Sequence, residues 1–201
     1  MLDARIEMLY RSDAETAEPI ALRQIRWLSS PFEIGFALLA GLATVLFLTI
    51  LVLAYVPGRY VTFTADGGWL TIDPSTAPVD GVTVSSLPIV LQAAGLVLAG
   101  VIYASLLLAL WSLKRLFACY RQGIVFADAP IRHMNRAGAG LVIYALAPGL
   151  AQPVMRALGS PDRAWFHGET IPILLTGAGL FVFARIMALG VRIAQDNKGF
   201  V

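Results

Sequence analysis

The chain has 201 residues, of which 58% are hydrophobic and 14% are charged, and its formal net charge is +2. Soluble domains are about one quarter charged, so this composition excludes an ordinary soluble domain and indicates a membrane protein. The single cysteine, Cys119, excludes an intramolecular disulfide and a cysteine-based zinc site.

Four apolar segments dominate the chain. A helix needs about 20 mainly apolar residues to cross a bilayer, and four segments meet or approach that length. They predict an all-α membrane protein with four transmembrane helices in two hairpins. The segments are residues 34–56, 89–113, 137–154 and 171–191. Pro148 and Pro153 interrupt the third, so we expect its helix to kink or end early.

The basic residues are distributed unevenly between the two sides of these segments. Twelve of the fifteen lie before the first segment, between the second and third, or at the end of the fourth. Because cytoplasmic loops carry the excess of Lys and Arg, both termini are predicted to be cytoplasmic. The twelve are Arg5, Arg11, Arg23, Arg26, Lys114, Arg115, Arg121, Arg132, Arg136, Arg185, Arg192 and Lys198.

The predicted organisation is an N-terminal segment, residues 1–33, followed by a four-span membrane domain, residues 34–201. Within the N-terminal segment, Leu2, Ile6 and Leu9 fall on one helical face, as do Ile25 and Leu28 with Leu22 or Ala21. This pattern indicates two short helices in a cytoplasmic amphipathic segment that leads into the first span and is also available to a cytoplasmic partner. No small-residue cleavage site follows the first apolar run, so we expect no cleaved signal peptide.

The connection between the first two spans has a strand-like pattern. Residues 60–64 and 69–72 are rich in β-branched and aromatic side chains, and Asp66-Gly67 between them is a favourable turn pair. We expect a short external β-hairpin that either covers the helix ends or offers a surface for docking or sensing.

The spans contain little that indicates chemistry. Arg185 is the only charge inside one, and Glu33 lies at the start of the first span, where the two side chains are candidates for an ion pair. His133 and His167 lie outside the spans, and the chain has no Walker, HExxH or GxSxG motif. We therefore expect no enzyme, no cofactor and no metal centre.

A small transporter or channel is the alternative interpretation. It requires a polar path through the membrane, formed by Gln92, Gln152 and Thr176. Glu33 and Arg185 would lie at the mouth of that path.

The basic loop Lys114–Arg136 connects the second and third spans. We expect the second helix to continue through Tyr120 and to end at Gly123, which supplies a left-handed cap. Phe126 is then predicted to pack back against the bundle. Asp128 is predicted to cap the next helix.

The arginines of this loop, Arg121, Arg132 and Arg136, are predicted to lie near the lipid headgroups, where they orient the helices and are available to a protein partner. Membrane topology already explains their charge, so we expect no direct contact with nucleic acid.

The loop and the C-terminal helix also resemble a known family. The residues that carry the resemblance are Leu116-Phe117, Tyr120–Phe126, Ile131-Arg132, Arg136–Gly138 and Phe183–Val201. In this order they resemble the bacterial four-span membrane proteins named DUF2975, a domain of unknown function. The resemblance covers roughly residues 34–201 and implies an inner-membrane location without implying a reaction. Family members are often encoded beside a small helix-turn-helix regulator, which implies a regulatory role.

These observations favour a non-enzymatic inner-membrane protein that acts through protein contacts. It would be either a signal-relay or regulatory partner, or an accessory subunit of a larger membrane complex, and its oligomeric state stays open. The candidate contact or structural positions are Glu33, Arg121, Gly123, Phe126, Arg132, Arg136 and Arg185.

Overall fold

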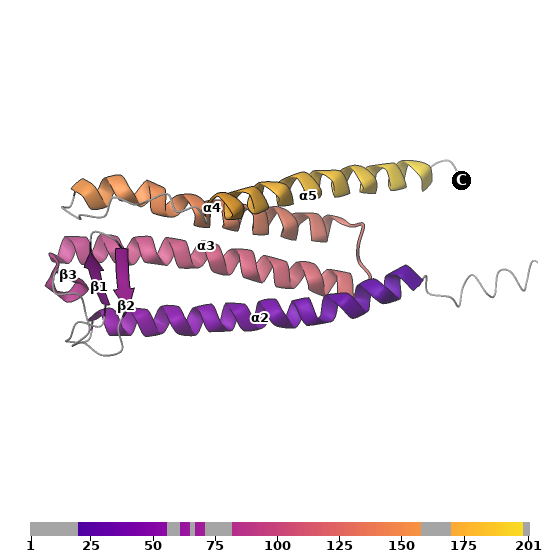
Figure 1. Ribbon diagram of the computed structural model, residues 1–201. Helices are drawn as coiled ribbons and strands as arrows, with labels where there is room; N and C mark the ends of the chain where they lie inside the picture. The colour runs from indigo at the N-terminus through magenta and orange to yellow at the C-terminus, as the bar shows by residue number, and fades with distance from the viewer. Residues whose placement is uncertain (1–19, 56–60, 65–66, 71–81, 158–169, 199–201) are drawn as a thin grey trace, which may run out of the picture.

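The computed structural model describes residues 20–55, 61–64, 67–70, 82–157 and 170–198 (Figure 1). Four long helices make up most of this part of the chain. They are α2 (Ile20–Tyr55), α3 (Ile89–Arg121), α4 (Asp128–Ala157) and α5 (Thr170–Lys198). The predicted helical face at Leu2, Ile6 and Leu9 lies outside the described residues.

Three of the helices are long and apolar enough to cross a membrane. The qualifying stretches are Gln24–Tyr55, Ile89–Arg121 and Thr170–Ile193. They confirm the prediction of a membrane protein with transmembrane helices. In the part of the chain that the structure describes, α4 does not meet the same criterion.

The first helix is longer than the apolar segment that predicted it. Helix α2 begins at Ile20, so the predicted division after residue 33 falls inside one continuous helix. Its 36 residues extend over about 54 Å, whereas the hydrocarbon core of a bilayer is about 30 Å thick. A substantial part of α2 therefore lies beyond the apolar layer.

The third helix does not end early, which was one of the two outcomes predicted from its prolines. Helix α4 continues through Pro148 and Pro153 to Ala157. A proline removes one helical hydrogen bond, and a long helix packed against neighbours tolerates that loss. Pro130 lies in the first turn, where the missing N–H group would have no intrahelical partner, and its side chain is fully buried.

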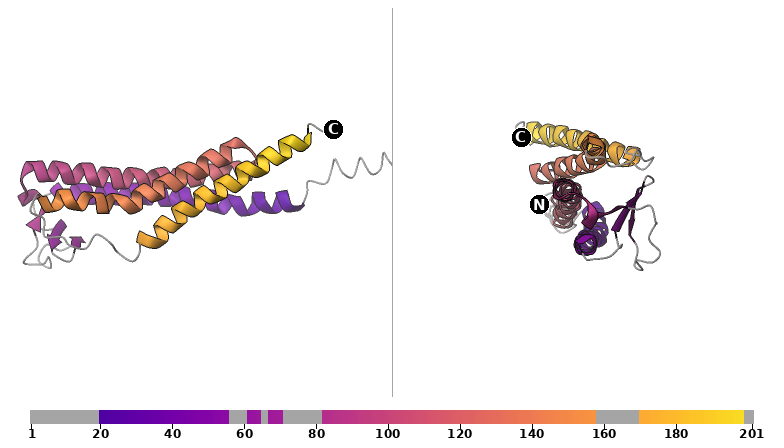
Figure 2. Two further views of the ribbon diagram at one scale, coloured as in Figure 1. Left: turned by 90° about the horizontal axis from the view of Figure 1, so that it is seen from above. Right: turned by 90° about the vertical axis from the view of Figure 1, so that its left-hand side faces the viewer.

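The helices are arranged in a row that follows the order of the chain. Helix α3 packs on α2, α4 packs on α3, and α5 packs on α4. The end-on view in Figure 2 shows this succession, and its other view shows α5 crossing α4 at an angle. In the described residues, α2 and α5 share no extended contact. Each edge helix therefore packs mainly against one neighbour.

Small residues allow the last three helices to approach closely. A Cβ atom built on Gly140 of α4 would lie 2.7 Å from the carbonyl oxygen of Ser105 in α3. A Cβ atom on Gly138 would lie 2.8 Å from the carbonyl oxygen of Gly177 in α5. Ala109 and Ala137 are fully buried nearby. We call this close packing of α3, α4 and α5 the glycine seam.

A small sheet lies at the end of the row where α2 ends and α3 begins (Figure 1). Strand β1 (Val61–Thr64) pairs antiparallel with β2 (Gly67–Leu70), with Val61 opposite Leu70. A third strand, β3 (Val82–Thr83), pairs with the other edge of β1 and leads into the short 3-10 helix η2 (Val84–Ser86). The central strand is therefore the first in sequence.

Candidate functional site

The candidate site lies at the end of the row opposite the sheet, where α2 starts, α3 is connected to α4, and α5 ends (Figure 1). Lys114, Arg115, Arg121, Arg132 and Arg136 lie there, in the last two turns of α3 and the first turns of α4. We call this region the basic end. The antiparallel alternation of the helices brings these charges together, because α3 ends where α4 begins.

A glycine cap ends α3 as predicted. Gly123 has φ +78°, the left-handed conformation that glycine adopts without strain. The amide of Ile124 donates to the carbonyl of Cys119 at 2.9 Å, and the amide of Gly123 donates to the carbonyl of Tyr120 at 2.9 Å. This pair of bonds defines a Schellman motif, which reverses the chain toward α4.

Two charged contacts connect α2 to this cap. Nε of Arg121 lies 2.8 Å from Oε2 of Glu33, so the partner of Glu33 is Arg121. The guanidinium group of Arg26 lies beside Gly123, with its Nη2 atom 3.1 Å from the position that a Cβ atom would occupy. A cation is favourable there because the carbonyl end of a helix carries partial negative charge.

Aromatic rings pack between the same two helices. Phe117 of α3 stacks on Phe32 and Phe36 of α2, with ring centroids 5.0 Å and 5.6 Å apart. Tyr120 meets Phe117 edge to face at 6.0 Å, and its hydroxyl group donates to Sδ of Met187 in α5 at 3.6 Å. Together with the Glu33–Arg121 pair, these rings form what we call the aromatic junction. It connects α2, α3 and α5 at the basic end.

Arginines from two helices surround His133 on α4. Burial of the imidazole, and then the charges of Arg136, Arg115 and Arg132, hold the pKa of His133 below its ordinary value. Arg115 belongs to α3, where its guanidinium group lies 5.6 Å from the ring centre of Trp111. The α3–α4 hairpin thus concentrates positive charge on one part of the basic end.

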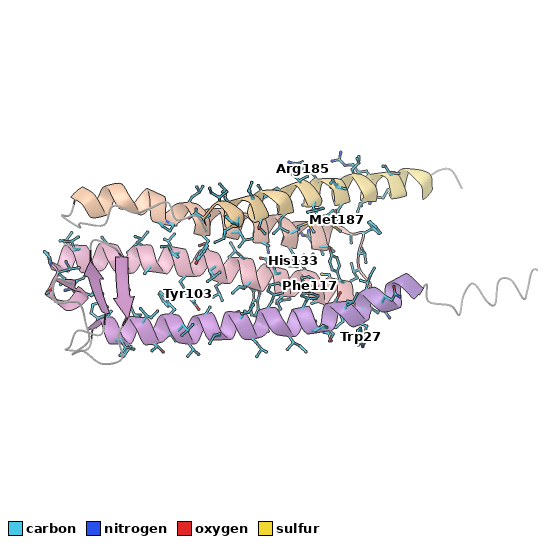
Figure 3. All side chains as sticks on the ribbon, in the orientation of Figure 1. Trp27, Tyr103, Phe117, His133, Arg185 and Met187 are labelled. Carbon is cyan, nitrogen blue, oxygen red and sulfur yellow. The ribbon has the colours of Figure 1, made fainter. Side chains whose placement is uncertain are left out.

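Two predicted positions behave differently from expectation. Phe126 is 70% exposed and only approaches Gly190 of α5, so the prediction that it packs back against the bundle is wrong. The tight cap at Gly123 redirects the chain without needing that contact. Arg185 is exposed on the outer side of α5, away from α2 (Figure 3), so it does not pair with Glu33.

The polar residues that a transport path would require do not show the predicted arrangement. Thr176 is exposed and its hydroxyl group donates to the carbonyl of Pro172 in its own helix. The side-chain amide of Gln92 donates to the backbone carbonyl of Leu87 at 2.8 Å. Glu33 pairs with Arg121 rather than meeting Arg185 at a mouth. The side chain of Gln152 lies outside the described part of the chain.

An apolar cavity of about 150 Å³ lies at the opposite end of the α2–α3 interface. Phe47 and Leu51 of α2, Leu91 and Gly95 of α3, and Val84 of η2 are among the residues that line it. The α2–α3 interface is therefore filled by rings at the basic end and is looser near the sheet.

Sequence reasoning missed Arg26, Phe32, Phe36 and Met187 as members of the site. The spacing of four between Phe32 and Phe36 places both rings on one face of a helix, which is a signal for a shared contact. That pattern does not identify Phe117 as the ring between them, because the partner depends on how α2 and α3 are aligned.

Comparison with protein families, curated proteins and solved structures finds no significant match. The resemblance to DUF2975 consequently stays a prediction. In the residues that the structure describes, no three His, Cys, Asp or Glu side chains are grouped so that they would hold a metal ion.

Proposed function

We propose that this chain is a non-enzymatic, four-span protein of the bacterial inner membrane that acts by binding another membrane protein. It would serve as a signal-relay or regulatory partner or as an accessory subunit, in keeping with its resemblance to DUF2975. The proposed topology has α4 as the fourth span, both termini in the cytoplasm and the sheet outside. It is supported by the course of α4, which starts at the basic end and runs back toward the end of the row where the sheet lies, before α5 returns in the opposite direction (Figure 1).

The observation that carries the proposal is the outer face of α2. Residues repeat on this face at alternating intervals of four and three, and all of them are exposed. They are Ile34, Leu38, Gly41, Val45, Leu48 and Val52. Leu38 is 68% exposed, and nothing lies within 4 Å of a Cβ atom built on Gly41. The spacing is that of a helix–helix seam, and a glycine within it allows a partner's spanning helix to approach closely.

The junction at the basic end provides a way for such contact to be transmitted. A partner on the outer face of α2 would act on a helix whose other face contacts Phe117 and Arg121 of α3. Tyr120 continues that contact to Met187 of α5. A change in the position of α2 would thereby reach the ends of three helices.

Co-purification in a mild detergent tests the proposal. The variant Gly41→Trp adds bulk to the outer face of α2, and Val97→Trp adds it to an exposed position of α3. We expect a specific membrane protein to be recovered with the wild type and with Val97→Trp, and to be lost with Gly41→Trp. Recovery of the same proteins with all three chains would contradict the proposed surface.

A further inference from the structure

A cluster of cations on the α3–α4 hairpin is not used by the proposed contact on α2. Arg132 and Arg136 are four residues apart on α4 and therefore lie on one face of that helix. Arg115 of α3 lies near enough to His133, the residue after Arg132, to act on its charge together with them. We call these three arginines the cationic surface.

The cationic surface carries charge that the described residues do not neutralise. Arg115, Arg132 and Arg136 are exposed. Of the carboxylates whose side chains the structure describes, Glu33 pairs with Arg121 and Asp128 pairs with none of the three. Their charges also act together on one group, since all three lower the pKa of His133.

An exposed aromatic side chain lies beside these charges. Trp111 is 48% exposed, and its ring is approached by Nζ of Lys114 at 4.6 Å and by the guanidinium group of Arg115 at 5.6 Å. Tryptophan is favoured at the boundary between hydrocarbon and headgroups. A tryptophan beside several arginines is the combination expected where a protein meets lipid headgroups.

We propose that the cationic surface binds the phosphate group of an anionic phospholipid, with Trp111 against the upper part of its acyl chains. Guanidinium groups bind phosphate oxygens in bidentate geometry, and three of them from two helices can surround one phosphate. Membrane topology accounts for the number of basic residues at this end of the molecule. It does not require three of them to converge without a carboxylate.

Native mass spectrometry of the full chain in detergent tests this proposal. The chain is offered an equimolar mixture of phosphatidylglycerol and phosphatidylcholine, and the bound lipids are counted. We expect the double variant Arg132→Gln/Arg136→Gln to lower the preference for phosphatidylglycerol about thirtyfold. Each cation near an anionic lipid surface strengthens binding about fivefold, and the variant removes two. The matched control, Arg185→Gln/Arg192→Gln, removes two exposed charges from α5 and should retain the preference.

Equal loss of preference in the two double variants would overturn the proposal, as would a wild type without preference. Stabilisation of the wild type by inorganic phosphate alone, to the same extent as by phosphatidylglycerol, would overturn the assignment to a lipid. The variant Arg132→Lys/Arg136→Lys keeps the charge but loses the bidentate geometry, so its preference should lie between that of the wild type and that of the glutamine variant.

The wild type supplies a second readout that needs no variant of the cationic surface. The chain has two histidines, so the imidazole signals of labelled protein are readily assigned by means of His133→Gln. Binding of an anionic phosphate should raise the pKa of His133 toward its ordinary value. A pKa that is the same in phosphatidylcholine and in phosphatidylglycerol would contradict binding at this surface.

Discussion

The glycine seam and the α2–α3 interface hold neighbouring helices together in different ways. In the seam, backbone meets backbone, and the position of a Cβ atom on Gly140 is only 2.7 Å from a carbonyl oxygen of α3. Between α2 and α3, the contacts are made by side chains such as Phe117 and Arg121, and a cavity of about 150 Å³ lies near the sheet. The difference indicates that α3, α4 and α5 form a rigid unit and that α2 is the helix most readily displaced.

Among the substitutions considered, one in the glycine seam should lower the free energy of unfolding most. In Gly140→Ala, the new Cβ atom would meet backbone atoms of Ser105 and Ala109, which cannot move aside without shifting α3. We expect the free energy of unfolding to fall by about 3 kcal/mol, at the upper end for overpacking. Denaturation in detergent micelles, followed by circular dichroism, measures it.

The matched control for this substitution is Gly41→Ala, where the added Cβ atom meets nothing within 4 Å. Its stability should be unchanged or raised slightly, since alanine is the better helix former. Equal destabilisation by the two substitutions would show that the seam is not close-packed.

Loss of the central ring of the aromatic junction should have the next largest effect. Phe117→Ala removes two stacked contacts and one edge-to-face contact. At about 0.5–1.5 kcal/mol for each aromatic pair, we expect a loss of about 2 kcal/mol. Phe183→Ala, which removes a ring that is 61% exposed, should change stability much less. A similar loss in both variants would indicate that ring stacking does not stabilise the junction.

The ion pair of the junction should contribute less than its rings. A double-mutant cycle with Glu33→Gln and Arg121→Gln should give a coupling energy of about 0.5 kcal/mol, because the Arg121 side chain is 53% exposed. Added salt should reduce it. A coupling energy of zero at low salt would show that this ion pair does not stabilise the junction.

The smallest effect should be a dependence of stability on pH. The pKa of His133 is lowered in the folded protein, so below the unfolded value, about 6.5, the unfolded chain binds more protons than the folded chain. Stability is therefore complete above about pH 6.5 and declines as the pH falls toward the folded pKa. Melting curves between about pH 5 and 8 should show this decline, and it should be weaker in His133→Gln. An identical decline in the variant would assign it to other groups.

The sequence predicted features that depend on neighbouring residues better than those that depend on packing. The left-handed cap at Gly123 was predictable because a glycine that follows a helix with a basic last turn is a local signal. A helical face at Ile25 and Leu28 was predicted, but its continuity with the first span in one helix from Ile20 was missed, because hydropathy identifies the apolar part of a helix rather than its end. Pro148 and Pro153 suggested that α4 would kink or end early, but the helix continues to Ala157.

In the candidate site, too, single residues were predictable from the sequence, whereas the contacts between them depend on packing. Glu33 and Arg121 were selected as single positions by their charge, but their pairing depends on the alignment of α2 with α3. Arg185 was predicted as a partner of Glu33 from its charge alone. The structure places α5 away from α2, so the two side chains do not meet. The position of Phe126 could not be predicted, since the geometry of the cap decides which way its ring points.

The central claim is that the outer face of α2 contacts a partner protein. A photo-crosslinking amino acid at Leu38, which is 68% exposed on that face, tests it most directly in intact membranes. The same amino acid at Val97, which is 67% exposed on α3, is the matched control. The account predicts a discrete protein adduct from position 38 and none from position 97. Adducts with lipid alone at both positions would contradict it.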